Sequence, residues 1–239
     1  YRKLIEDHLA VPVLVGKKTD MEKFAGAQTT TTLEAMMPDG KALQMGTSHN
    51  LGQNFSKPFG IKFLDKNGGE KFVWTTSWGI STRLIGGLVM THGDDKGLVL
   101  PPRIANIQAV LVPIFYNAKE KKTVLKKCEQ ISEMLNRVCI TAHVDTREGY
   151  TPGWKFNEWE MKGVPIRIEI GPKDLKKKQV TIVRRDTGAK LTVKEKVVDK
   201  KILELLEEIQ KILFTKAKKF LQENIATVKN YDAFKKILE

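Results

Sequence analysis

Short segments in which apolar and polar residues alternate dominate the first third of the chain, and such alternation is typical of strands with one buried face. Asp39-Gly40 and Asn67-Gly68 each separate two of these segments and are strong turn signals. The sequence therefore predicts successive antiparallel strands rather than βαβ units. The predicted strands are Thr29–Met37, Lys41–Thr47, Phe59–Leu64 and Lys71–Thr76.

Two further elements flank these strands. Leu9–Val15 is a short apolar run that ends at Gly16, which predicts a buried strand, and Pro12 favours an edge or irregular position for it. Ser77-Trp78-Gly79 interrupts the alternation. Ser81–Thr91 then has helical spacing, and we expect one face of this helix to be apolar, formed by Leu84, Ile85 and Leu88.

The second half of the chain alternates strands with helices, which predicts an α/β domain with a largely parallel sheet. A hairpin around Asp186-Thr187-Gly188 and a long helix, Val197–Asn224, follow. We assign the apolar stripe of that helix (Ile202, Leu205, Ile209, Ile212 and Leu213) to the core. The predicted elements are the strands Ile107–Ile114, Cys139–Asp145, Pro165–Ile170, Gln179–Arg184 and Lys190–Val193, and the helices Ala118–Asn136, Phe156–Lys162 and Tyr231–Leu238.

The composition indicates a soluble, cytosolic protein. Of 239 residues, 41% are hydrophobic and 29% are charged, and neither a membrane-spanning run nor a signal peptide is found. Cys128 is expected in a helix and Cys139 in a strand, both reduced, and their spacing argues against a metal site within this chain.

The net charge of +13 indicates an anionic partner. Nucleic acid is the first class to test and an anionic membrane the second. A surface rich in lysine and glutamate that has no such partner, as in thermophilic proteins, is the alternative.

Small polar residues gather where the strand Lys41–Thr47 is predicted to end, namely Thr47, Ser48, His49 and Asn50. They favour either a site for a polar small molecule or an ordinary turn. Arg83 lies in the first turn of the helix Ser81–Thr91, where the helix dipole disfavours a cation but where helix amides and a guanidinium suit a bound phosphate. A phosphate-binding loop at Gly16-Lys17-Lys18-Thr19 is rejected, because Val11 replaces its first glycine.

Three long strings resemble class II prolyl-tRNA synthetases of the archaeal/eukaryotic type, and the resemblance covers nearly the whole chain. It implies a class II catalytic domain built on an antiparallel sheet, then an anticodon-binding domain. Such enzymes activate L-proline with ATP and Mg²⁺ to prolyl-adenylate and transfer proline to the 3′ end of proline tRNA. The strings are KFAGAQTTTTLEAMMPDGKALQMGTSHNLGQNFSKPF (23–59), TTSWGISTRLIGGLVMTHGDDKGLVLPPRIA (75–105) and TPGWKFNEWEMKGVPIRIEIGPKD (151–174).

The resemblance also implies roles for individual residues. Arg83 matches the motif 3 arginine that grips the ATP γ-phosphate, and Ser81 replaces the usual threonine. The resemblance further implies an ATP site with Gln44 and Thr47, a proline pocket with Phe24, His49, Trp78 and Gly79, and anticodon contacts by Phe156, Glu160, Arg167 and Lys173.

From the residues alone, some of these positions have structural alternatives. Phe24 and Phe156 suit core packing, and Glu160 could simply pair with Lys162.

We expect residues 1–103 to form the end of the catalytic domain, 104–195 the anticodon-binding domain, and 196–239 a helical segment leading to a further domain. Motifs 1 and 2, with the dimer interface of a homodimer, would precede Tyr1, and a domain that often carries zinc would follow Glu239. We therefore expect this chain to be a fragment that is inactive alone. The alternatives are a synthetase-derived tRNA-binding module without aminoacylation activity and a class II synthetase for another amino acid.

Overall fold

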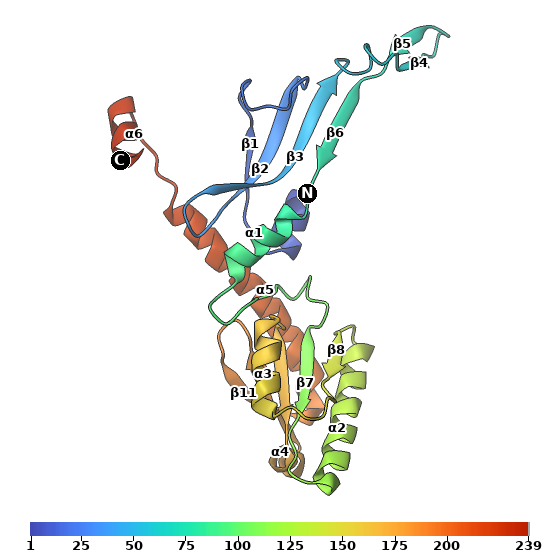
Figure 1. Cartoon of the computed structure of the whole chain (residues 1–239), viewed down its shortest axis with the longest axis vertical. Helices are drawn as coiled ribbons and strands as arrows, with labels where there is room; N and C mark the ends of the chain where they lie inside the picture. Colours follow the sequence, from blue (N-terminus) through green and yellow to red (C-terminus); the bar gives the residue numbers. More distant parts are fainter. Residues whose placement is uncertain (239) are drawn as a thin grey trace.

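A computed structural model describes residues 1–238 as two α/β bodies arranged along one elongated molecule (Figure 1). We call residues 1–93 the N-terminal body and residues 106–223 the C-terminal body. The long helix α5 (Val198–Glu223) begins in the C-terminal body and reaches the N-terminal body, and a short helix, α6 (Tyr231–Leu238), follows it. Within the described residues, no helix is both long and apolar enough to cross a membrane.

The N-terminal body is built on a four-stranded antiparallel sheet in the order β1-β2-β3-β6, which confirms the predicted antiparallel architecture. The turn at Asp39-Gly40 joins β2 to β3, and Gly40 has the positive φ of +78° that such a turn requires. The strands are β1 (Leu14–Lys17), β2 (Thr29–Met36), β3 (Ala42–Gly52) and β6 (Thr75–Gly79).

Three of the predicted strand limits are wrong. β1 begins only at Leu14, because the segment before it packs Val11 and Val13 irregularly into the core. β3 does not end at Thr47 but continues to Gly52, because its polar residues keep their ladder partners on both β2 and β6. Ser77-Trp78-Gly79 does not interrupt the sheet but lies within β6.

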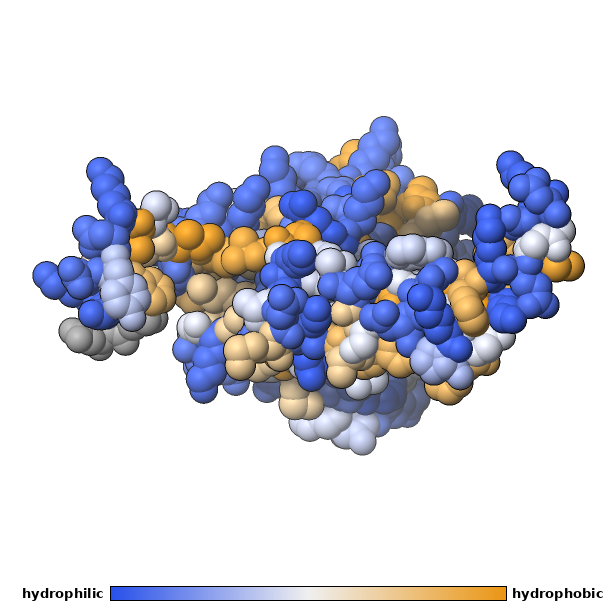
Figure 2. Space-filling view, turned by 90° about the horizontal axis from the view of Figure 1, so that it is seen from above, coloured by the Kyte–Doolittle hydropathy of each residue, from blue (hydrophilic) through white to orange (hydrophobic). Residues whose placement is uncertain are grey.

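A small hairpin projects from this body (Figure 1). It consists of β4 (Lys62–Leu64) and β5 (Glu70–Phe72), which are shorter than predicted, and the Asn67-Gly68 turn joins them as predicted. These strands form a separate two-stranded sheet. Figure 2, seen from this end of the molecule, shows apolar patches within a largely hydrophilic surface.

Two helical segments complete the N-terminal body: a π-helical turn at Leu4–His8, and α1 (Arg83–His92). α1 approaches β3 closely at Gly87, where a Cβ atom would lie 2.8 Å from Sδ of Met45. Leu88 is buried as predicted, but the side chain of Ile85 is 63% exposed, because the close-packed face of α1 runs through Gly87 and Leu88.

The C-terminal body is built on a five-stranded sheet in the order β11-β10-β9-β7-β8. β7 pairs in parallel with β8 and β9, and the predicted hairpin β10–β11 adds two antiparallel strands. The strands are β7 (Ala109–Pro113), β8 (Ala142–Val144), β9 (Ile166–Ile170), β10 (Gln179–Arg184) and β11 (Lys190–Lys194). The other helices are α2 (Ala118–Arg137), α3 (Pro152–Met161), α4 (Pro172–Lys177) and a 3-10 turn at Glu195–Val197.

The alternation of buried residues along β7 separates two hydrophobic clusters. Ala109 and Leu111 face the larger one, which α2 and the first half of α5 share, whereas Val110 and Val112 pack against Trp159 of α3. The C-terminal body therefore has three layers, with the sheet in the middle. Because α5 contributes Ile202, Leu205, Ile209 and Leu213 to this core, it is integral to the body's packing.

The structure corrects two predictions for the second half and adds one helix. Ile212 of α5 is 37% exposed rather than in the core. Cys139 is not a strand residue: it is exposed, with a φ of +61°, in the turn before β8. The helix α4 was not expected, since its six residues give too short a pattern to detect. Cys128, in contrast, is buried in α2 as predicted, and burial raises the pKa of its thiol to about 12.

Polar contacts bind the start of the linker to the C-terminal body. Arg185 donates to both carboxylate oxygens of Asp94, in the loop that follows α1, and its Nε donates to the carbonyl oxygen of Glu160 at 2.8 Å. Lys96 of the same loop pairs with the Glu160 side chain at 3.1 Å. The loop after α1 is thereby bound to the end of α3.

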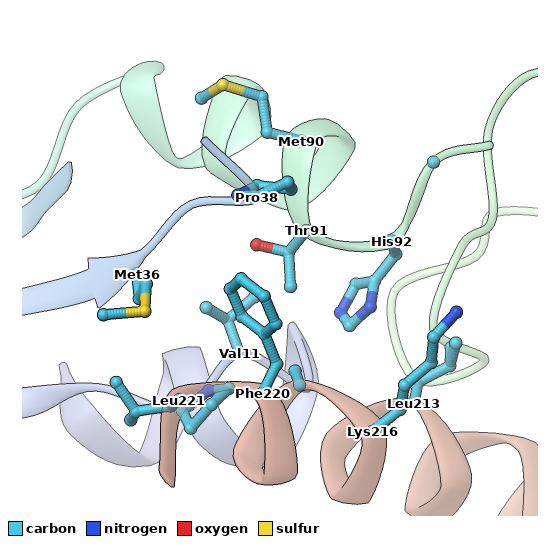
Figure 3. Close-up of a pocket in the computed structure, with 13 residues that line it drawn as sticks. Val11, Met36, Pro38, Met90, Thr91, His92, Leu213, Lys216, Phe220 and Leu221 are labelled. Carbon is cyan, nitrogen blue, oxygen red and sulfur yellow. The ribbon is translucent and has the colours of Figure 1, made fainter. Parts of the chain in front are cut away.

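A second junction lies where α5 passes the N-terminal body. The buried amide of Gln210 donates to the carbonyl oxygens of Asp7 and His8 and accepts from the backbone N–H of Arg103. Farther along α5, a mainly apolar hollow of about 270 Å³ remains between the two bodies (Figure 3). Residues of both bodies line it, among them Val11, Met36, Met90, Phe220 and Leu221.

Gly163, which packs on the linker, generates the first prediction. Its φ is +73°, and a Cβ atom would lie 2.7 Å from backbone atoms of Leu98, whereas Gly188 has a similar φ of +70° with open space around it. Gly188→Ala should lower the free energy of unfolding by about 1 kcal/mol through backbone strain alone. Gly163→Ala should lower it by about 1–3 kcal/mol more, because the added methyl group overpacks against Leu98, and urea unfolding measures both losses. Equal losses in the two variants would contradict this packing.

The Asp94–Arg185 ion pair generates a prediction about pH. Hydrogen bonds from Arg185 lower the pKa of Asp94 to about 2 from an ordinary value of 3.8. The pair therefore stabilises the fold fully above about pH 4, and this contribution falls as the pH drops toward 2. Because Asp94 is half-exposed, we expect no more than about 1 kcal/mol from it.

Urea unfolding between pH 6 and pH 2 would check this. Asp94→Asn should be less stable than the unchanged chain at pH 6, and the gap should close near pH 2. Asp95→Asn is the matched control, because Asp95 makes no ion pair within residues 1–238. A gap that persists unchanged at pH 2 would show that the carboxylate charge is not what stabilises this contact.

Candidate functional site

A β-bulge in β3 decides which side chains reach the outer face of the N-terminal sheet. Leu33 of β2 opposes Gly46 and Glu34 opposes Gln44, so Met45 is the extra residue. Met45 is buried in the core, and the bulge brings Gln44 to the same face as Thr47 and His49. Without the bulge, strict alternation would place Met45 there instead.

The imidazole of His49 is held between two hydroxyl groups. Nδ1 lies 2.8 Å from Oγ1 of Thr30, and Nε2 lies 3.2 Å from Oγ1 of Thr47. Thr30 is directly opposite His49 in the β2–β3 register and is 1% exposed, and its hydroxyl also accepts from the backbone N–H of Phe24. Both ring nitrogens are therefore engaged, which fixes the orientation of the ring.

Phe24 lies against this histidine, with ring centroids 5.0 Å apart, and also packs on Phe55. Gly26 makes this approach possible, because a Cβ atom there would lie 2.8 Å from the Phe55 ring. The Phe24 side chain is still 48% exposed, so it is not a core residue. The structure thus brings together Phe24 and His49 beside a partly open aromatic wall.

An open hollow of about 330 Å³ lies between β3, β6 and the start of α1. Seven of the predicted site residues line it, from both strands and from the turn that enters the helix. Gly46 allows Ile80 to approach β3 closely, because a Cβ atom at Gly46 would lie 2.9 Å from the Ile80 side chain. The seven are Gln44, Thr47, His49, Trp78, Gly79, Ser81 and Arg83.

Arg83 is the first residue of α1 and is exposed at the rim of this hollow. Its backbone N–H donates to Oγ of Ser81 at 3.3 Å, and Nη1 makes a long contact of 3.5 Å with the carbonyl oxygen of Gln44. No carboxylate within residues 1–238 pairs with its guanidinium. A free guanidinium beside helix N–H groups, hydroxyls and an amide suits a polyanion such as a nucleotide phosphate chain.

Trp78 and Gly79 form the β6 side of the hollow. The indole of Trp78 is 64% exposed and meets Tyr1 edge-to-face at 5.9 Å, while a Cβ atom at Gly79 would have nothing within 4 Å. The lining contains no carboxylate, so it does not by itself supply the oxygen ligands that Mg²⁺ prefers. Among the residues that the structure describes, no group of three or more His, Cys, Asp or Glu is placed to hold a metal ion.

The predicted anticodon residues are only partly together. Arg167 lies over the ring of Phe156 at 4.3 Å and shares a basic pocket of about 190 Å³ with Glu160. Phe156 is also partly buried against the core. The alternative pairing of Glu160 with Lys162 is wrong, since Lys162 pairs with Glu158 and Glu160 pairs with Lys96. Lys173 is exposed on α4, beyond the far end of β9.

Three residues of these sites were not predicted from the sequence: Thr30, Arg184 and Arg185. The hydroxyl of Thr30 contacts the His49 ring. The predicted β2–β3 hairpin could have indicated this contact, because it places Thr30 opposite His49. Arg184 and Arg185 line the basic pocket, and the hydrogen bonds that Arg184 donates to Asp186 and to Glu208 raise the pKa of Arg184 above its ordinary value. Asp186 is a neighbour of Arg184 in the sequence, but Glu208 and Asp94, which also pair with these arginines, are too distant in sequence to anticipate.

Thr30 generates a prediction for this site. Thr30→Val keeps the shape of the side chain but leaves His49 Nδ1 and the Phe24 N–H without the hydroxyl, which should cost about 1–3 kcal/mol in urea unfolding. Thr31→Val, on the exposed face of the same strand, is the control and should change stability little. A neutral Thr30→Val would show that this hydroxyl is not needed to hold the ring.

Each of the two bodies matches a known protein family. Residues 2–92 match the family described as "tRNA synthetase class II core domain (G, H, P, S and T)", and residues 108–211 match the family described as "Anticodon binding domain". The second match extends into α5, consistent with the core that this helix shares.

Curated relatives match the chain along its whole length. "Proline--tRNA ligase" of Natranaerobius thermophilus and "Proline--tRNA ligase 2" of Bacillus cereus (strain ZK / E33L) are each 52% identical over 239 residues, which is 100% of this chain and 49% of each relative. "Proline--tRNA ligase" of Oceanobacillus iheyensis is 51% identical over 240 residues. These relatives are bacterial, so the archaeal/eukaryotic type suggested by the sequence strings is not confirmed.

The chain spans about half the length of these curated relatives. Its two bodies match the two domain families in the order in which they occur along the chain, with the linker between them. The chain therefore carries a class II tRNA synthetase core domain over residues 2–92, followed by an anticodon-binding domain over residues 108–211.

Proposed function

We propose that this chain is part of a proline–tRNA ligase, which activates L-proline with ATP and transfers it to proline tRNA. Relatives that carry this name are 52% identical over the whole chain. The observation that carries the proposal is the guanidinium of Arg83, unpaired within the described residues, at the rim of a hollow lined by hydroxyls and an amide.

In this proposal the hollow holds ATP. Arg83 grips the γ-phosphate with a charge-assisted fork, and Gln44, Thr47 and Ser81 supply neutral polar contacts. The bulge at Met45 supports this assignment of Gln44, because it turns the amide toward the hollow. Class II synthetases generally use ATP with Mg²⁺, but the lining of the hollow offers no carboxylate to hold this ion.

The reaction requires no nucleophile from the protein. A carboxylate oxygen of proline attacks the α-phosphorus, forming the P–O bond of prolyl-adenylate while the bond to pyrophosphate breaks. A terminal ribose hydroxyl of the tRNA then attacks the prolyl carbonyl, loses its proton, and releases AMP. Catalysis consists of positioning and charge stabilisation, so Arg83 acts by stabilising the charge that builds up on the leaving pyrophosphate.

Proline would lie beside His49, Phe24, Trp78 and Gly79. The orientation of the imidazole between Thr30 and Thr47 supports a rigid wall at this place, and the Phe24 ring gives the small apolar ring of proline a flat partner. Open space at Gly79 supports its role as the side through which the ligand approaches.

Anticodon bases would contact Phe156, Glu160 and Arg167, around the basic pocket. Phe156 offers an aromatic face, Glu160 can accept from a guanine edge, and Arg167 is a cation for phosphate or base. Lys173 lies apart from these three and would have to reach another nucleotide.

The rest of the proposal concerns the whole protein. We propose that the parent is a cytoplasmic homodimer, that motifs 1 and 2 lie outside this chain, that any zinc site lies in a further domain, and that the isolated chain does not activate proline. We propose 1–103 as the end of the catalytic domain and 104–195 as the anticodon-binding domain, with α5 of the segment 196–239 packed into the core of that second domain.

ATP–pyrophosphate exchange with proline, on the full-length parent, tests the proposal. Arg83→Ala should lower kcat/KM by about 10²–10³-fold, which corresponds to about 2.7–4 kcal/mol of lost transition-state stabilisation. Arg137→Ala is the control, because Arg137 is an exposed arginine at the end of α2 in the other body. Exchange that depends on proline and survives Arg83→Ala would overturn the role of Arg83.

The same assay distinguishes the second candidate, a tRNA-binding module without aminoacylation activity. The net charge of +13 and the anticodon-binding domain favour RNA binding in either case. A folded full-length parent that binds proline tRNA but shows no exchange would establish the module and exclude the ligase.

A further inference from the structure

A cluster of charged and aromatic side chains lies on one flank of α3, outside the sites described above. Asp145 follows β8, is fully buried, and accepts from Nε and Nη2 of Arg147 at 3.0 and 2.7 Å and from the indole N–H of Trp159 at 2.8 Å. Burial alone would raise the pKa of Asp145, but the hydrogen bonds from Arg147 and Trp159 outweigh it and hold the pKa well below its ordinary value. The Arg147 side chain is therefore fixed by a buried carboxylate.

Tyr150 and Trp154 stack beside this arginine. Their ring centroids are 4.1 Å apart with 22° between the ring planes, and the residues are 47% and 44% exposed. The guanidinium carbon of Arg147 lies 5.4 Å from each ring centroid. A guanidinium that covered one outer ring face would be much farther from the second ring, so equal distances place Arg147 beside the stack and leave the outer faces uncovered by it.

Arg147 also keeps one donor group free. Nε and Nη2 are occupied by Asp145, and Nη2 also binds Glu158, whereas Nη1 donates to no acceptor within residues 1–238. The side chain is 37% exposed, so this group can be reached from solvent. The cluster thus presents a flat aromatic face and an N–H donor side by side, and the buried carboxylate of Asp145 holds the donor in place.

This surface is separate from the predicted anticodon contacts. Phe156 lies two residues after Trp154 on α3, about 200° around the helix. Phe156 meets Arg167 of β9, whereas Trp154 meets the segment that follows β8. Because β8 and β9 lie on opposite sides of β7, and α3 packs on β7, the two aromatic sites occupy opposite flanks of one helix.

We propose that an unpaired base of the tRNA anticodon loop stacks on the Tyr150–Trp154 pair, and that Nη1 of Arg147 donates to a phosphate of the same strand. The inference rests on the proposed function, in that it requires the chain to bind tRNA. Single-stranded RNA is bound through aromatic faces together with cations along the backbone, and stacking tolerates any base. The pair would therefore position the loop, while the pocket around Glu160 would read it.

Rigidity favours this role for the cluster. A partner that binds a surface immobilised by a buried carboxylate does not have to order long side chains when it binds. The anticodon-binding family match over residues 108–211 and the net charge of +13 favour RNA as the occupant over an apolar protein surface.

Fluorescence titration of the 239-residue chain with a short RNA hairpin that carries the proline anticodon loop tests the proposal. We place 2-aminopurine at each loop position in turn, and expect protein binding to quench one of these positions through stacking. Trp154→Ala should abolish that quenching and raise Kd about tenfold, within the range for losing one stacked base. Trp154→Phe should keep Kd within about twofold. Trp74→Ala, at an exposed tryptophan in the other body, should leave binding unchanged.

A hairpin with an abasic nucleotide at the quenched position completes a double-mutant cycle. It should bind the unchanged chain about as weakly as the intact hairpin binds Trp154→Ala, and the two changes together should cost no more than either alone. Additive losses would overturn the stacking contact. The quenching measured on the unchanged chain does not depend on whether the alanine variant folds.

The outcomes separate this inference from the proposed function. Tight binding of the hairpin with no quenching dependent on Trp154 and an unchanged Kd for Trp154→Ala would overturn the inference and leave tRNA binding intact. A chain that does not bind the hairpin at all would contradict tRNA binding, and the inference would fall with it.

Discussion

The register of β2, β3 and β6 is the constraint on which the N-terminal body depends. One extra residue in β3 puts Met45 into the core and Gln44 onto the outer face, so that a single strand serves both packing and site. The same register places Thr30 opposite His49 and Gly79 opposite Thr47. A shift of this register by one residue would move every side chain of the shifted strand to the opposite face of the sheet, and both the core and the hollow would be lost.

The C-terminal body depends instead on charged side chains that are buried together with their partners. Asp145, Arg184, Arg185 and Lys155 are all buried, and each has a counter-charge or carbonyl partner. Burying such groups is costly unless they are paired, so these pairs specify one arrangement of strands and helices rather than adding much net stability. Several of them lie around α3, the helix that carries both aromatic surfaces.

Most of the architecture follows from local patterns in the sequence. The Asp39-Gly40 and Asn67-Gly68 turns, the helix α2 and the hairpin β10–β11 depend on turn chemistry and periodicity, which are local properties. The length of β3 does not, since Thr47–Asn50 are turn formers by composition and become strand only because two neighbours offer ladder partners. The prediction of Cys139 as a strand residue was wrong, because no local signal in the sequence marks a residue with left-handed backbone conformation before β8.

The candidate sites were foreseen to a similar degree. Residues close in sequence or on paired strands, such as Gln44, Thr47, His49 and Arg83, do line one hollow. The partners of Glu160 could not be foreseen, because Lys96 lies in the loop after α1 and Arg185 follows β10, both far from Glu160 in the sequence. Lys173 was grouped with them by resemblance alone, and its side chain lies elsewhere.

The ten residues of α1 span about 15 Å along the N-terminal body. Arg83 begins this helix, and Asp94, bound by Arg185, comes two residues after its end. Because Gly87 in the middle of α1 packs directly on Met45, the sheet holds the whole helix in place. One short helix thereby connects the rim of the hollow to the place where the linker is bound to the C-terminal body.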